Sequence, residues 1–120
     1  MRILSFSLMW PKFLDEEFTT FRSAGYWRLN ETVQIWYKQR HSSRMKVGIA
    51  TIIALERVKI TPDSKYSREI RLMTNEEAIR DGFDSSADMV QWLRRAHGNK
   101  LTPIMDKLTL RWNKRELDHD

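Results

Sequence analysis

The chain has 120 residues, of which 41% are hydrophobic, and its 21 basic and 16 acidic side chains give a net charge of +5. A length of this order predicts one domain with a buried core. The absence of cysteine excludes disulfides, thiolate metal ligands and a thiol nucleophile. No apolar run approaches the roughly 20 residues that span a bilayer, and no signal peptide is visible, so we expect a cytoplasmic protein without a membrane partner.

The first quarter of the sequence predicts a strand, a short helix and a second strand. Residues 2–6 form an apolar strand pattern. Proline suits the first turn of a helix because its missing N–H would have no partner there, so Pro11 predicts a helix over residues 11–17. β-branched and aromatic residues at 19–22 favour a return to strand.

The middle of the sequence predicts further strands. Residues 31–38 alternate between apolar and polar side chains, and residues 45–55 are apolar on both faces, which is typical of a central strand. Residues 39–44 form a polar, basic loop between them. Residues 57–61 continue the central strand, and residues 66–73 are a weaker strand pattern.

The last third predicts a pair of helices and a closing strand. Thr74 and Glu77 have the spacing of a capping box, and the helix that they open ends at Gly82. A second helix begins after residues 84–86 and ends at Gly98.

Alternation over residues 108–112 predicts a final strand. Strands do not alternate regularly with helices, so a doubly wound parallel sheet is excluded. We expect an α+β fold: a small, mostly antiparallel β-barrel with one N-terminal helix, across one opening of the barrel, and a late helix pair. It forms a single domain over residues 1–115, followed by a frayed tail at 116–120.

The order of these elements resembles that of ASCH domains, which belong to the PUA-like superfamily. In that family an apolar strand and a Trp- or Pro-bearing helix precede a segment Gly-x-Lys-Thr-x-Thr-x-Arg. Here the corresponding segment runs from Asp15 to Arg22, with Thr20 and Arg22 matching and Glu17 in place of the lysine. Later parts of the family pattern correspond to Gly48-Ile49-Ala50, Glu76 to Phe83, Met89 to Leu93 and Leu108 to Trp112.

The resemblance implies a cleft beside the first helix that binds RNA or modified nucleosides, with Thr20 and Arg22 in it. Some members of the family are amidohydrolases that act on acylated cytidine through a threonine, a lysine and a carboxylate. Thr20 matches that threonine, and Asp81 lies roughly where the carboxylate is expected. Glu17 replaces the lysine, and a threonine hydroxyl is a poor nucleophile without an adjacent base or cation. Glu17 is also typical of a solvated helix end.

Candidate binding residues also follow from the residue types. Arg22 either holds a phosphate or base edge or is tied to Asp15 or Glu16. Trp27, beside Arg28, and Trp36, on the polar face of its strand, either stack on bases or are covered by a helix. Two basic clusters would contact phosphates: Lys38, Arg40, His41, Arg44 and Lys46, and then Arg94, Arg95, His97 and Lys100, which Lys107, Arg111, Lys114 and Arg115 extend. Arg94 and Arg95 would equally complement a helix dipole.

No metal-ligand spacing, phosphate-binding loop or nucleophile elbow is present, so we expect neither a metal nor a cofactor. The leading hypothesis is a non-enzymatic module that binds single-stranded RNA or DNA and holds a nucleotide in a cleft near Thr20 and Arg22. One alternative is a small hydrolase of RNA or a modified nucleoside that uses Thr20 with Glu17 or Asp81. Another is a protein-interaction module whose basic surface is incidental.

Overall fold

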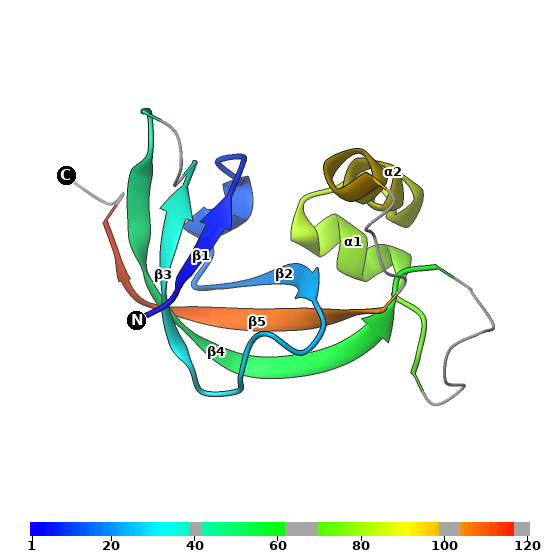
Figure 1. The fold of residues 1–120 in the computed structure, drawn as a ribbon, viewed down its shortest axis with the longest axis horizontal. Coiled ribbons are helices and arrows are strands. Elements are labelled where there is room, and N and C mark those ends of the chain that lie inside the picture. The colour runs from blue at the N-terminus through cyan, green and yellow to red at the C-terminus, as the bar shows by residue number, and fades with distance from the viewer. Residues whose placement is uncertain (39–41, 62–69, 99–103, 117–120) are drawn as a thin grey trace.

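The computed structural model describes residues 1–38, 42–61, 70–98 and 104–116. These form a five-stranded sheet in the order β1-β3-β4-β5-β2, with two helices packed on one end of it (Figure 1). The strands are β1 (Ile3–Phe6), β2 (Glu17–Ser23), β3 (Thr32–Tyr37), β4 (Met45–Lys59) and β5 (Ile104–Arg115). Only β1 and β3 run parallel; the other neighbours are antiparallel.

The sheet curls into a half-barrel and does not close in the described part of the chain. β1 and β2 are its two edges, and no backbone ladder joins them. The expected mostly antiparallel, curled sheet is therefore confirmed, whereas the barrel is open. The expected strands at 2–6, 19–22, 31–38, 45–61 and 108–112 lie within or close to observed strands. Most of the expected strand at 66–73 lies outside the described residues; Leu72 forms an isolated bridge with Lys59.

The prediction of an N-terminal helix over residues 11–17 is wrong. A single 3-10 turn, η1 (Pro11–Leu14), follows β1, and the backbone is already extended at Asp15. Pro11 starts this turn as expected, but Phe13 is drawn into the core, and Glu17 begins β2 by pairing with Arg111 of β5. Edge pairing with β5 therefore overrides the local helical preference.

Two irregularities in β4 place hydrophobic side chains on both faces of the sheet. Register shifts occur between Ile49 and Ala50 and between Ile52 and Ala54. Because successive side chains alternate between faces, an extra residue reverses the side that later residues present. The first cluster fills the curl with Leu4, Phe6, Phe13, Phe18, Val33, Ile35, Val47, Ala50, Ile52, Leu108 and Leu110. The second lies under the helices and contains Phe21, Val58, Ile60, Met73, Ala78, Met89, Leu93 and Met105.

The expected helix pair is present as α1 (Asn75–Asp81) and α2 (Ser86–His97). The capping box forms as expected: Thr74 and Glu77 each accept a hydrogen bond from the other's backbone N–H. Gly82 ends α1 with φ of 114°, a left-handed conformation that favours glycine. Neither helix of the described residues is long and apolar enough to cross a membrane.

Candidate nucleotide-binding cleft

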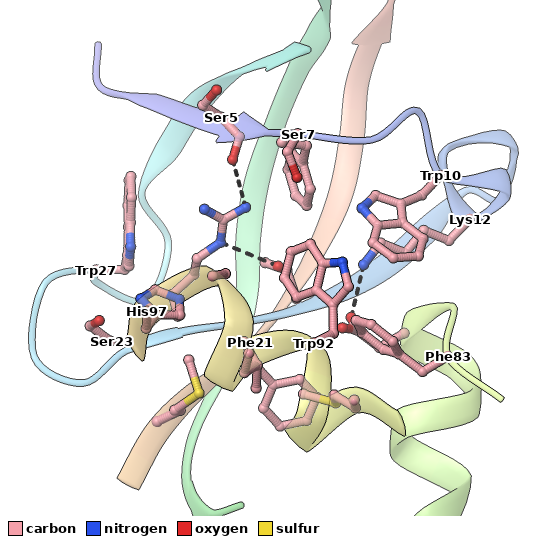
Figure 2. Close-up of a pocket in the computed structure, with 18 of the residues that line it drawn as sticks. Ser5, Ser7, Trp10, Lys12, Phe21, Ser23, Trp27, Phe83, Trp92 and His97 are labelled. Atoms are coloured by element: carbon pink, nitrogen blue, oxygen red, sulfur yellow. Dashed lines mark hydrogen bonds and ion pairs between the residues drawn. The ribbon is translucent and has the colours of Figure 1, made fainter. Parts of the chain in front are cut away.

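A cleft of about 980 Å³ opens between β1 and η1 on one side and α2 on the other, above β2 (Figure 2). It separates the half-barrel from the helices. Its walls combine aromatic rings with basic side chains. The lining residues are Arg2, Ser5, Phe6, Ser7, Trp10, Lys12, Thr20, Phe21, Arg22, Ser23, Tyr26, Trp27, Lys38, Asp81, Phe83, Met89, Trp92, Leu93, Ala96, His97 and Met105.

Arg22 spans the gap between the two edge strands. From β2, its Nη2 donates to the carbonyl of Ser5 in β1 at 2.8 Å, and its Nε donates to Thr20 Oγ1 at 3.3 Å. The guanidinium also lies 4.5 Å from the ring centre of Phe6. These contacts fix the guanidinium in the cleft wall, and none of them involves Nη1.

The surroundings of Arg22 leave its charge without a carboxylate partner. Burial lowers its pKa to about 10, and the nearby charge of Asp81 opposes that shift. A pKa of that size still keeps Arg22 charged at neutral pH. Among the described residues no carboxylate lies within ion-pair distance of it, so the alternative in which Asp15 or Glu16 ties it down is not observed.

A buried ion pair forms the opposite wall. Lys12 of η1 donates to Asp81 Oδ1 at 2.8 Å and to the carbonyl of Thr19 at 2.7 Å, and Thr19 Oγ1 donates to the same Asp81 oxygen at 3.3 Å. The Lys12 and Asp81 side chains are 5% and 6% exposed. Lys12 Nζ also lies 5.2 Å from the ring centre of Trp10.

Burial acts on both partners of this pair. It lowers the pKa of Lys12 and raises the pKa of Asp81, and the attraction between the two opposes each shift. Both contacts to Asp81 use Oδ1; no described residue donates to Oδ2, which is not sealed from solvent. Since Asp81 lines the cleft, Oδ2 is an acceptor available to a ligand.

Three aromatic side chains form the inner wall of the cleft. The ring centre of Trp10 lies 5.2 Å from that of Phe83 and 6.2 Å from that of Trp92. Gly82 allows this arrangement, because a Cβ at that position would lie 2.6 Å from the Trp10 ring. The end of α1 is thus shaped around Trp10.

Tyr26 and Trp27, in the loop between β2 and β3, form a second aromatic group at the outer end of the cleft. Tyr26 is 66% exposed. The guanidinium of Arg2 lies 4.3 Å from the Trp27 ring centre, and Glu31 accepts two hydrogen bonds of 2.6 Å from Arg2. Figure 2 shows Ser5, which holds Arg22, between Trp27 on one side and Trp92 on the other.

The structure brings some of the predicted site residues together and separates others. Thr20, Arg22, Trp27, Lys38 and Asp81 all line the cleft, so Arg22 lies in a concave site as expected.

Other predicted site residues lie outside the cleft. Glu17 is exposed and pairs with Arg111. Trp36 does not line the cleft; it lies on the face of β3 opposite Val33 and Ile35, with its Nε1 donating to Gln34 at 2.9 Å.

The predicted basic side chains differ in whether they line the cleft. Arg28, Arg44, Arg94 and Arg95 are exposed and do not line the cleft, while Lys46 pairs with Glu116 at 3.4 Å. Arg40, His41 and Lys100, which were predicted to contact phosphates, lie outside the described residues. His97, from the end of α2, reaches the cleft wall, whereas Lys107 and Arg111 are engaged in ion pairs with Glu77 and Glu17.

Sequence reasoning did not assign Lys12, Trp10, Trp92, Phe83 or Tyr26 to the site. Lys12 has no local signal, because its partner Asp81 is 69 residues away in the sequence. The aromatic residues come from the N-cap of η1, from α2 and from two loops, and only the packing of these segments brings them to one cleft.

The described residues contain no group of three or more His, Cys, Asp or Glu side chains placed to hold a metal ion. The side chains that line the cleft supply aromatic rings for stacking, hydrogen-bonding groups and charge.

Comparison with known proteins defines the fold. No family model matches the sequence, and no curated protein matches it significantly. Among solved structures, ASCH from Zymomonas mobilis is similar over 94% of this chain and 68% of its own, with a TM-score of 0.51 and 18% sequence identity. The chain therefore has an ASCH-like fold, as the order of its sequence elements predicts.

Proposed function

We propose that this protein binds single-stranded nucleic acid, RNA in the first instance, and holds a nucleotide in the cleft beside η1. The observation that carries the proposal is Arg22, a fixed cation that has no carboxylate partner among the described residues and lies in a cleft walled by aromatic rings. Bases stack on such rings whatever their sequence, and a guanidinium binds phosphate oxygens. The ASCH-like fold supports the proposal, because ASCH domains are PUA-like modules thought to bind RNA.

The charges that line the cleft favour an anionic ligand. Lys12 and Asp81 neutralise each other, and Arg2 is neutralised by Glu31. Arg22 and Lys38 remain without an ion-pair partner among the described residues. Asp81 Oδ2 adds an acceptor for an N–H group on a base edge, a contact that carboxylates make in base recognition.

The test is a fluorescence titration with single-stranded RNA and DNA at several salt concentrations. If about four to six phosphates are neutralised, log affinity falls against log salt with a slope near −3 to −4, at about 0.7 per contact. Replacing Arg22 by methionine, which keeps the length of the side chain but removes its charge, should weaken binding. Absence of binding to every oligonucleotide at low salt would overturn the proposal.

The exposed cations and Trp36 give matched variants for the same titration. Replacing Arg94 and Arg95 together by alanine should flatten the slope by roughly 1.4 if both contact phosphates. Arg111→Ala is the control, since Arg111 is paired with Glu17 and lies outside the cleft lining. Trp36→Ala lowers affinity by about 1–3 kcal/mol, with little change of slope, only if a base stacks outside the cleft.

A hydrolase is the second candidate, because Lys12 places a buried cation beside Asp81 in the cleft. The hydroxyl that lines the cleft is that of Thr20, and it contacts Arg22; the hydroxyl bonded to Asp81 is that of Thr19. Among the described residues the Thr20 hydroxyl thus makes no hydrogen bond to the carboxylate, which favours binding over hydrolysis. The test is hydrolysis of RNA or of an acylated nucleoside by the wild-type protein. Product release that is lost in Thr20→Val would establish the hydrolase.

A further inference from the structure

We propose that the cleft takes two consecutive nucleotides of a single strand, with the linking phosphate on Arg22. This inference rests on the proposed function and specifies its ligand. The inner base would stack in the wall formed by Trp10 and Trp92, and the outer base on Tyr26 in the loop between β2 and β3. The nucleic-acid strand would enter the cleft at the end where Tyr26 is exposed.

The aromatic side chains of the cleft fall into two separate groups. Trp10, Phe83 and Trp92 contact one another, with ring centres between 5.2 and 6.2 Å apart. Tyr26 and Trp27 belong to another element, and among the described residues no ring contact joins them to the inner group. Because the two groups come from different elements of the cleft lining, we assign one base to each group.

Arg22 lies between these two positions. In Figure 2, Trp27 and Trp92 lie to the left and to the right of the hydrogen bond that the Ser5 carbonyl accepts from the Arg22 guanidinium. The known contacts of the guanidinium use Nε and Nη2, which leaves Nη1 for a phosphate oxygen. Because a phosphodiester lies between consecutive bases, a cation between two stacking positions matches the repeat of a single strand.

The size of the cleft is consistent with two bound nucleotides. Its volume of about 980 Å³ lies at the upper end of the roughly 300–1,000 Å³ that is usual for pockets holding one small molecule. A cleft of that size leaves room for a second nucleotide unit beside the first. Arg22 and Lys38, which have no ion-pair partner in the part of the chain that the structure describes, suit a linking phosphate and a neighbouring one.

The experiment measures the affinities of AMP, the 5′-phosphorylated dinucleotide and the 5′-phosphorylated trinucleotide of adenosine, in ribose and deoxyribose forms. One more stacked base is worth roughly five- to 150-fold in affinity. We expect the dinucleotide to bind about tenfold or more tightly than AMP, and the trinucleotide within about threefold of the dinucleotide. Calorimetry or quenching of tryptophan fluorescence reports each affinity.

Tyr26→Ala locates the outer position. Since Tyr26 is 66% exposed, its replacement leaves the core intact. The affinity for the dinucleotide should fall fivefold or more, while that for AMP stays unchanged. Leu29→Ala, in the same loop and 55% exposed but outside the cleft lining, is the matched control and should change neither affinity. Trp92→Ala should weaken both ligands equally.

The outcomes separate this inference from the proposed function. Equal affinities for AMP and the dinucleotide would overturn the two-nucleotide cleft and leave nucleotide binding intact. A further tenfold gain with the trinucleotide, or an equal loss of both ligands in Tyr26→Ala, would also overturn it. Failure of all the oligonucleotides to bind would instead remove the proposed function itself.

Discussion

Two carboxylates on α1, those of Glu77 and Asp81, lie one helical turn apart but differ in how many of their oxygens are hydrogen-bonded within the protein. Glu77 accepts hydrogen bonds from Arg71, Lys107 and the backbone of Thr74, which together engage both of its oxygens. These contacts, the bonds from Arg71 first, hold its pKa well below the usual range. Asp81 lies in the cleft wall, where burial raises its pKa and one of its oxygens has no donor among the described residues.

The difference separates a structural carboxylate from one available to a ligand. Glu77 fastens the start of α1 to β5 and, through Arg71 and Glu56, to β4. All of its hydrogen-bonding capacity is used inside the protein. Asp81 fastens the end of α1 to η1 through Lys12 but keeps an acceptor open toward the cleft. Substitutions at Glu77 should therefore change stability without changing ligand binding. Substitutions at Asp81 should change both.

The largest effect is expected from breaking the buried pair. Lys12→Met or Asp81→Leu alone leaves an uncompensated buried charge and should lower the free energy of unfolding by about 3–5 kcal/mol. The double variant removes both charges and should recover much of that loss without restoring nucleotide binding. Chemical denaturation of the three variants measures this. Single variants as stable as wild type would show that the pair is not buried in solution.

Gly82→Ala should have the next largest effect. Alanine is strained at φ of 114°, and its Cβ would meet the Trp10 ring at 2.6 Å, so we expect a loss of about 2–4 kcal/mol. Because Trp10 must move, oligonucleotide affinity should fall as well. Thermal unfolding and titration of the same sample test both. An unchanged affinity in the folded variant would show that Trp10 does not bind the ligand.

Glu77→Gln should cost about 1–2 kcal/mol at pH 7. A carboxylate whose pKa is lowered by folding stabilises above its unfolded pKa of about 4.3 and loses that contribution as the pH falls toward the folded value. The stability gap between wild type and variant should therefore shrink below about pH 4. Denaturation series at pH 7 and pH 3 measure the gap, and oligonucleotide affinity at pH 7 should not change.

The smallest effect is expected at the exposed pair of Glu17 and Arg111. Its side chains are 42% and 56% exposed, so Glu17→Gln should change stability by less than about 1 kcal/mol. Because Glu17 lies outside the cleft lining, affinity and any hydrolytic activity should also remain at the wild-type level. A loss of affinity or of hydrolytic activity would show that Glu17 takes part in the functional site.

The sequence by itself determined the elements whose causes are local. Alternation of side chains predicted β3 and β5, and apolar runs predicted β1 and β4. The spacing of Thr74 and Glu77 predicted the capping box of α1. Thr20 and Arg22, expected from the ASCH resemblance, do line the cleft.

Only the tertiary structure decided the rest of the site. Pairing of β2 with β5 replaced an expected helix over residues 11–17 by a single turn. That turn carries Lys12 to Asp81, 69 residues away, and the packing of the helical region against the start of the chain brings Phe83 and Trp92 to Trp10 in one cleft. Such contacts depend on the packing of whole elements, which no window of the sequence contains.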